Sequence, residues 1–101
     1  MFNVVFMELA YDDYDEISEY LAQFYPGTIG RFLTELEKYT TILQSTPYAF
    51  ETYEPYPQYR RMVVHDYLVF YKVFDETHKV EIHRILHGAR NIQNILGGVR
   101  E

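Results

Sequence analysis

The chain of 101 residues contains no cysteine, and this absence excludes several kinds of chemistry. Disulfide bonds, thiolate metal sites and a cysteine nucleophile all require that residue. The first basic residue is Arg31, so the N-terminal segment lacks the positively charged region with which a signal peptide begins. No apolar run approaches the length of a membrane span. We therefore expect an unprocessed cytoplasmic protein without membrane contact.

Positive charge is scarce overall, and it is unevenly distributed. Residues 1–56 carry ten Asp and Glu against only Arg31 and Lys38, whereas residues 57–101 carry seven Lys and Arg and all four histidines. The formal net charge of −6 argues against direct binding of nucleic acid, because proteins that bind phosphates are usually far more basic. The basic residues of the second half are the expected working set.

Motifs for cofactors and metals are also absent. The sequence has no P-loop, no GxSxG and no dinucleotide-binding glycine pattern, and we expect no cofactor. His83 and His87 are four residues apart, which on a strand separates them by about 13 Å, too far to share one ion. The carboxylates of residues 12–19 are typical of the solvated face of a helix. We expect no metal site.

What the chain does contain is apolar and aromatic area. Hydrophobic residues make up 48% of the chain and eleven residues are tyrosine, which favours a folded chain over a disordered one. The length suits one domain, residues 1–101.

The first half predicts a strand and two helices. Residues 2–6 (FNVVF) form a short run suited to a strand buried on both sides. Apolar residues recur at helical spacing from Ala10 to Phe24, and again between Thr28, a suitable N-cap, and Pro47. The two helices should form an antiparallel hairpin.

The second half predicts three strands and a short helix. Residues 59–64, 67–74 and 79–87 form strands joined by tight turns at 65–66 and 75–78, and residues 89–96 form the helix. The order β-α-α-β-β-β-α indicates an α+β domain: a small, mostly antiparallel sheet with the N-terminal helical hairpin on one face. We expect the core to be complete without the last helix.

The simplest strand registers sort the side chains onto two faces. The helix-covered face receives Met62, Val64, Val69, Tyr71, Val73, Val80, Ile82 and Leu86. The other face receives Arg61, Val63, Leu68, Phe70, Lys72, Glu81, His83, Ile85 and His87, and a bulge in the last strand would add Arg84. We expect this second face to be open, a mixed apolar and basic surface of the kind that binds a protein partner.

Five basic residues are the remaining candidates for chemistry: Arg60, Arg61, Arg84, His87 and Arg90. One interpretation is ordinary surface charge at strand ends. The functional interpretation is recognition of an anion or an acidic partner, because guanidinium groups make directional contacts with carboxylates and phosphates.

These residues also carry a resemblance to a known family. Tyr59-Arg60-Arg61, the run 67–71 (YLVFY) and the run 82–91 (IHRILHGARN) closely resemble plasmid-stabilisation toxins of the RelE/ParE superfamily. The similarity extends back to residues 15–17 and 20–22. Residues 84–91 are its most specific part and are closer to the ParE branch.

The resemblance implies the toxin of a type II toxin-antitoxin module, neutralised by its antitoxin and inhibiting DNA gyrase rather than acting as an enzyme. RelE-type members instead cleave mRNA on the ribosome, and for that alternative Arg84 and His87 would be the catalytic candidates. Leu68 stands where those nucleases carry an arginine, and their C-terminal tyrosine is absent. An inert antitoxin-binding homologue is a third alternative, and a homodimer is left open.

Overall fold

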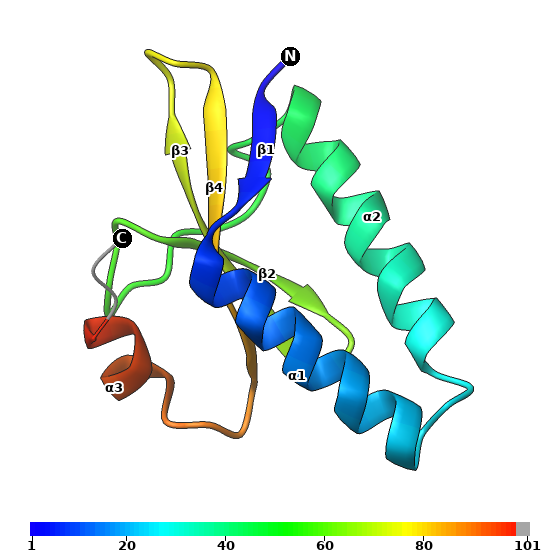
Figure 1. Cartoon of the computed structure of the whole chain (residues 1–101). Coiled ribbons are helices and arrows are strands. Elements are labelled where there is room, and N and C mark those ends of the chain that lie inside the picture. Colours follow the sequence, from blue (N-terminus) through cyan, green and yellow to red (C-terminus); the bar gives the residue numbers. More distant parts are fainter. Residues whose placement is uncertain (99–101) are drawn as a thin grey trace.

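Residues 1–98, the part of the chain that the computed structural model describes, form helices and strands in the predicted order. The elements are β1 (Asn3–Phe6), α1 (Glu8–Phe24), α2 (Ile29–Ser45), β2 (Arg60–Val64), β3 (Tyr67–Phe74), β4 (Lys79–His87) and α3 (Ile92–Gly97) (Figure 1). The α+β class is confirmed. No helix in residues 1–98 is long and apolar enough to cross a membrane.

The four strands form one mixed sheet in the order β1-β4-β3-β2. The β2–β3 and β3–β4 pairs are antiparallel, as predicted, whereas β1 runs parallel to β4. The prediction that the first strand is buried on both sides is wrong: Asn3 is exposed and the rest of β1 is half-buried. Its place at the sheet edge explains this, because an edge strand has a neighbour on one side only.

Both hairpin turns contain a histidine with positive φ. His65 has φ 54° in the two-residue turn between β2 and β3, and His78 has φ 50° before β4. Val64 pairs with Tyr67 and Phe74 with Lys79, which are the registers expected from the turn lengths.

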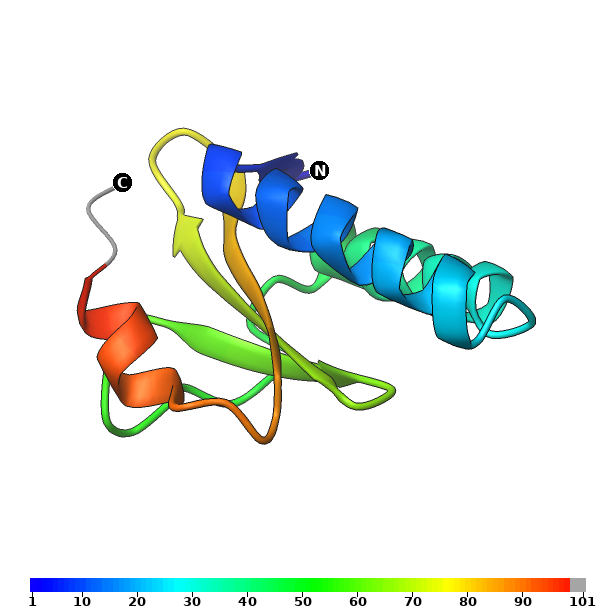
Figure 2. The ribbon, with the colours of Figure 1, turned by 60° about the horizontal axis from the view of Figure 1, so that its bottom comes forward.

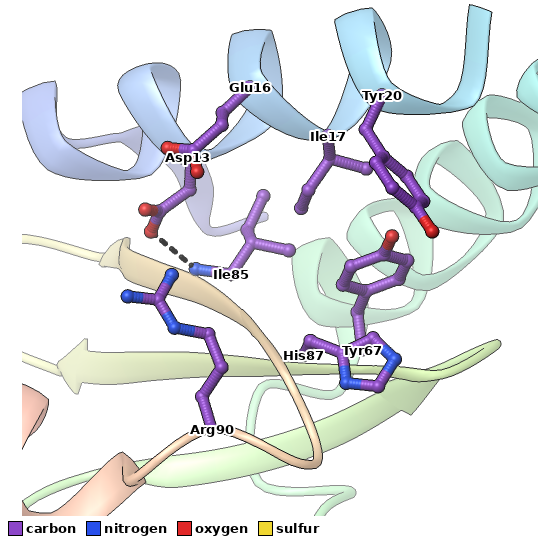
Figure 3. Close-up of a pocket in the computed structure, with 8 residues that line it drawn as sticks. All are labelled: Asp13, Glu16, Ile17, Tyr20, Tyr67, Ile85, His87 and Arg90. Carbon is purple, nitrogen blue, oxygen red and sulfur yellow. Dashed lines mark hydrogen bonds between the residues drawn. The ribbon is translucent and has the colours of Figure 1, made fainter. Parts of the chain in front are cut away.

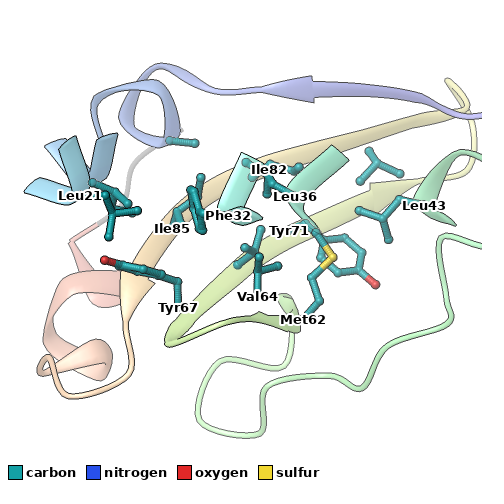
Figure 4. Packing of buried hydrophobic residues seen from close by; sticks show 14 residues of the cluster. Leu21, Phe32, Leu36, Leu43, Met62, Val64, Tyr67, Tyr71, Ile82 and Ile85 are labelled. Atoms are coloured by element: carbon teal, nitrogen blue, oxygen red, sulfur yellow. The ribbon is translucent and has the colours of Figure 1, made fainter. Parts of the chain in front are cut away.

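Helices α1 and α2 cover one face of the sheet and diverge from their connecting turn (Figure 1). Their buried residues recur at helical spacing, as Asp13, Ile17 and Leu21 do in α1. Figure 4 shows how the apolar ones, such as Leu21, Phe32 and Leu36, meet side chains of the sheet. The buried core on this face consists of Ala10, Ile17, Leu21, Phe32, Leu36, Leu43, Met62, Val64, Tyr67, Val69, Tyr71, Val80, Ile82 and Ile85.

A β-bulge in β4 reverses part of the predicted facing. Tyr71 pairs with Ile82 but Phe70 pairs with Arg84, so His83 is an extra residue in the ladder. One extra residue shifts all later side chains to the opposite face. Ile85 therefore lies in the helix-covered core and Leu86 on the other side, the reverse of the prediction.

The second face of the sheet is covered as well, so the prediction of an open face is wrong. α3 lies apart from α1 and α2 (Figures 1 and 2). Its buried side chains Ile92 and Leu96 pack with Tyr59, Phe70 and Leu86 in a second cluster. The core is therefore incomplete without the C-terminal helix, contrary to expectation.

Candidate binding groove

The basic residues predicted as the working set are largely engaged inside the molecule. The Nη1 of Arg60 donates a hydrogen bond of 2.7 Å to the Phe50 carbonyl, and its guanidinium lies 4.8 Å from the Tyr48 ring centroid. Lys72 Nζ lies 4.9 Å from the centroid of the Tyr59 ring. These contacts use the cations to hold the 46–59 connector against the strands.

Arg84 has a structural partner on α1. Its Nε and Nη2 donate hydrogen bonds of 2.7 and 2.8 Å to the two carboxylate oxygens of Asp13. The same carboxylate accepts a bond of 2.9 Å from the Ile85 backbone N–H. Bidentate arginine–carboxylate pairs are among the stronger polar contacts in proteins, so this pair fastens α1 to β4 just after the bulge.

The predicted apolar patch on the second face is not assembled. Phe70 is 0% exposed and Ile85 is 2% exposed, whereas Val63 is 56% exposed at the edge strand β2. Leu68 is half-buried beside the second cluster. Arg61 lies with Val63 at a separate hollow between β2 and the connector. Phe70 thus cannot contact a partner from this position, and Ile85 lies on the helix-covered side of the sheet instead of on the second face.

Three predicted residues, Ile85, His87 and Arg90, line a groove between α1 and the end of the sheet (Figure 3). The groove consists of two cavities of about 340 and 420 Å³ that share Tyr20, Tyr67 and His87. The first is also lined by Asp13, Glu16, Ile17, Ile85 and Arg90, and the second by Leu21, Tyr25, Thr28, Phe32, His65 and Asp66. We call these two neighbouring cavities together the α1 groove.

The floor of the α1 groove is apolar and its rim is aromatic. Ile17 and Ile85 are buried beneath it, whereas Tyr20 and Tyr25 are 49% and 55% exposed. Their rings are in contact, with centroids 6.1 Å apart. Burial raises the pKa of the Tyr67 hydroxyl above its usual value of 10.0, and Tyr20 and Asp66 add to this rise. Tyr67 is therefore a neutral hydrogen-bonding group at neutral pH.

The two walls of the groove differ in charge. On the α1 side, Glu16 is exposed and lines the groove. On the opposite side, His87 Nδ1 accepts a hydrogen bond of 3.1 Å from the Ala89 N–H, which orients the ring. Arg90 points toward Asp13 in Figure 3. The groove thus combines apolar surface with charges of both signs.

The described residues contain no cluster of three His, Asp or Glu that could hold a metal ion. His83 is buried, with its Nε2 3.0 Å from Glu81 Oε1. Burial by itself would raise the pKa of Glu81, but hydrogen bonds from Lys79 and His83 outweigh it and lower the pKa below 4.5.

Arg84, one of the two residues of the nuclease alternative, does not line the α1 groove with His87.

Comparison with protein families identifies the chain. A family model described as the ParE toxin of the type II toxin-antitoxin system, parDE, matches residues 4–92. The chain belongs to this family. As the resemblance implied, it is a toxin of the RelE/ParE superfamily.

Solved structures show the same fold. The chromosomal ParDE system from P. aeruginosa aligns with a TM-score of 0.70 and 15% identity, covering 86% of this chain and 96% of that one. The E. coli RelBE complex aligns with a TM-score of 0.62 and 15% identity, covering 89% and 100%. The YoeB-YefM complex from Staphylococcus aureus aligns with a TM-score of 0.54 and 14% identity, covering 86% of this chain and 97% of that one. A comparison with curated protein sequences gives no match.

Sequence reasoning about this ParE-family chain missed the aromatic rim of the α1 groove. Tyr20 and Tyr25 were not among the candidates, because aromatic residues near a helix with apolar periodicity usually belong to its core. The signal that sets Tyr20 and Tyr25 apart is structural: both side chains remain about half exposed, and large aromatics that remain exposed often mark contact surfaces.

Proposed function

We propose that this ParE-family toxin inhibits DNA gyrase and is neutralised by an antitoxin that binds it directly. The family match over residues 4–92 is the observation that carries the proposal. The structural likeness to a ParDE system, with a TM-score of 0.70, supports it, and toxin–antitoxin complexes recur among the similar structures.

The arrangement of polar residues favours an inhibitor over a nuclease. Cleavage of RNA without a metal needs a base, an acid and cations gathered around the scissile phosphate. In residues 1–98 Arg84 is paired with Asp13, and His83 is buried. Leu68 supplies no charge on the middle strand. His87 and Arg90 then remain beside an acidic helix, which is a poor site for an RNA phosphate.

The test is expression of the toxin without antitoxin, followed by assays on purified components. We expect inhibition of gyrase-mediated supercoiling, accumulation of DNA cleavage complexes, and relief of both effects when the antitoxin is added. Primer extension on a message translated by purified ribosomes is the matched assay for the nuclease alternative, and we expect no codon-positioned cuts. Cuts that His87→Ala abolishes would replace the proposal with the RelE-type activity. Antitoxin binding without any effect on gyrase would leave an inert binding module.

A further inference from the structure

The α1 groove combines an apolar floor with an acidic flank, and this combination specifies the chemistry of its occupant. We propose that the groove binds a segment of the antitoxin in which apolar side chains are flanked by Lys or Arg. This inference rests on the proposed function, since it takes the partner to be the antitoxin. It reverses the sign of charge expected from the sequence, where basic residues were to attract an acidic partner.

The apolar part of the argument comes from the depth and rim of the groove. Ile17, Ile85 and Phe32 form a buried floor beneath the two adjoining cavities. Tyr20 and Tyr25 remain about half exposed at the rim although they contact each other. Aromatic residues around a preformed hollow are typical of sites where a partner inserts apolar side chains.

The charge argument comes from α1. This helix carries six carboxylates and no Lys or Arg, and only one of them, Asp13, forms an ion pair within residues 1–98. Asp12, Glu16 and Glu19 are exposed at spacings of four and three, which places them along one side of the helix over about 10 Å. Glu16 itself lines the groove, and Asp12 and Glu19 extend the same row along α1, so we call these three carboxylates the acidic flank of the groove.

The remaining charges around the groove do not cancel this flank. The opposite wall presents Arg90 and the histidines His65 and His87, while Asp66 adds a further carboxylate. Two of the other cations expected to attract an acidic partner are engaged, Arg84 with Asp13 and Arg60 with Phe50 and Tyr48. Arg61 lies at the separate hollow beside Val63 and lines neither cavity of the groove. Opposite charges across an interface speed association and select partners, so a segment with Lys or Arg fits the α1 side.

The first experiment reverses charge on the flank and measures affinity for the purified antitoxin by calorimetry at low and high salt. Glu16→Lys combined with Glu19→Lys should weaken binding about tenfold at low salt and less at high salt. Glu76→Lys is the matched control, because Glu76 is an exposed carboxylate in the turn before β4 and lines neither cavity. Its affinity should stay within about twofold of the native value.

Tyr20→Ala tests the apolar rim and should weaken binding about thirtyfold or more.

The outcomes separate the inference from the proposed function. Tighter binding by the Glu16→Lys and Glu19→Lys protein would show an acidic segment and overturn the inference while antitoxin binding stands. Unchanged affinity in all groove variants, with native circular dichroism, would show that the antitoxin docks elsewhere. Failure of the native toxin to bind antitoxin would overturn the proposed function and the inference together.

A second experiment identifies the segment directly. A photoreactive phenylalanine derivative replaces Tyr20, the complex is irradiated, and mass spectrometry maps the cross-linked peptide. We expect an antitoxin peptide that carries Lys or Arg next to apolar residues. A cross-linked antitoxin segment of net negative charge, or cross-links only to a second toxin molecule, would overturn the inference.

Discussion

Asp13 shows how a single residue can change the meaning of a sequence pattern. In the sequence it is one of several acidic residues of a helix, and the solvated face is their usual place. In the fold it is 7% exposed and accepts three hydrogen bonds, two from Arg84 and one from the Ile85 N–H. It thus joins α1 to β4 and fixes the wall of the α1 groove.

Asp13→Ala should lower the free energy of unfolding by about 2–4 kcal/mol, because it removes the buried carboxylate that accepts two hydrogen bonds from Arg84 and one from the Ile85 N–H. Urea unfolding followed by circular dichroism measures this change. Asp15→Ala, at an exposed position of the same helix, should alter stability by less than about 0.5 kcal/mol. Equal effects of the two substitutions would contradict the structural role of the Asp13–Arg84 pair.

Tyr71 is a second residue whose role depends on its surroundings. It is 0% exposed and its hydroxyl donates a hydrogen bond of 2.8 Å to the Pro47 carbonyl, tying β3 to the chain just after α2. Burial raises its pKa to about 12, although nearby Arg60 acts in the opposite direction. Between pH 10.0 and about 12 the Tyr71 hydroxyl therefore stays neutral in the folded protein, whereas it is already ionised in the unfolded chain.

Tyr71→Phe should lower the free energy of unfolding by about 1 kcal/mol at neutral pH, because the Pro47 carbonyl loses its donor. The native contribution of Tyr71 is present below pH 10.0 and is lost as pH rises toward 12, since only the unfolded state ionises in that interval. The stability difference between native and variant should therefore vanish by about pH 11. Tyr11→Phe, at an exposed tyrosine, is the control. A difference that persists at high pH would be inconsistent with the raised pKa.

At the scale of elements, α3 is a structural part of the domain. A helix of six residues has little stability of its own, and it is ordered here because Ile92 and Leu96 pack on the second face of the sheet. The approach is close: a Cβ placed on Gly97 would lie 2.7 Å from the Tyr56 hydroxyl. The connector and α3 therefore form one layer over Phe70 and Leu86.

Leu96→Ala should destabilise the protein by about 2–4 kcal/mol, because it opens a cavity in the second cluster. Gln93→Ala, on the exposed side of α3, should change stability by less than about 0.5 kcal/mol. Thermal and urea unfolding of both variants provide the measurement.

A chain ending after Gly88 should be strongly destabilised, with Phe70 uncovered. Native-like unfolding of that truncated chain would mean that the second cluster contributes little.

At the scale of the whole molecule, the division between an acidic first half and a basic second half takes on a different meaning. Basic residues of the second half serve internal contacts: Arg84 holds α1, and Arg60 and Lys72 hold the connector. The α1 groove takes one wall from the acidic half and the other from the end of the sheet. The surface offered to a partner is thus built from both halves.

The sequence by itself determined the order of elements, the α+β class, the tight turns and the family, because these follow from local periodicity, turn residues and short motifs. Tertiary structure decided which side chains are exposed. One extra residue at His83 reversed the facing of Ile85 and Leu86, and α3 covered a face that the pattern left open. Strand register and helix docking depend on contacts between segments far apart in the chain, which no local pattern encodes.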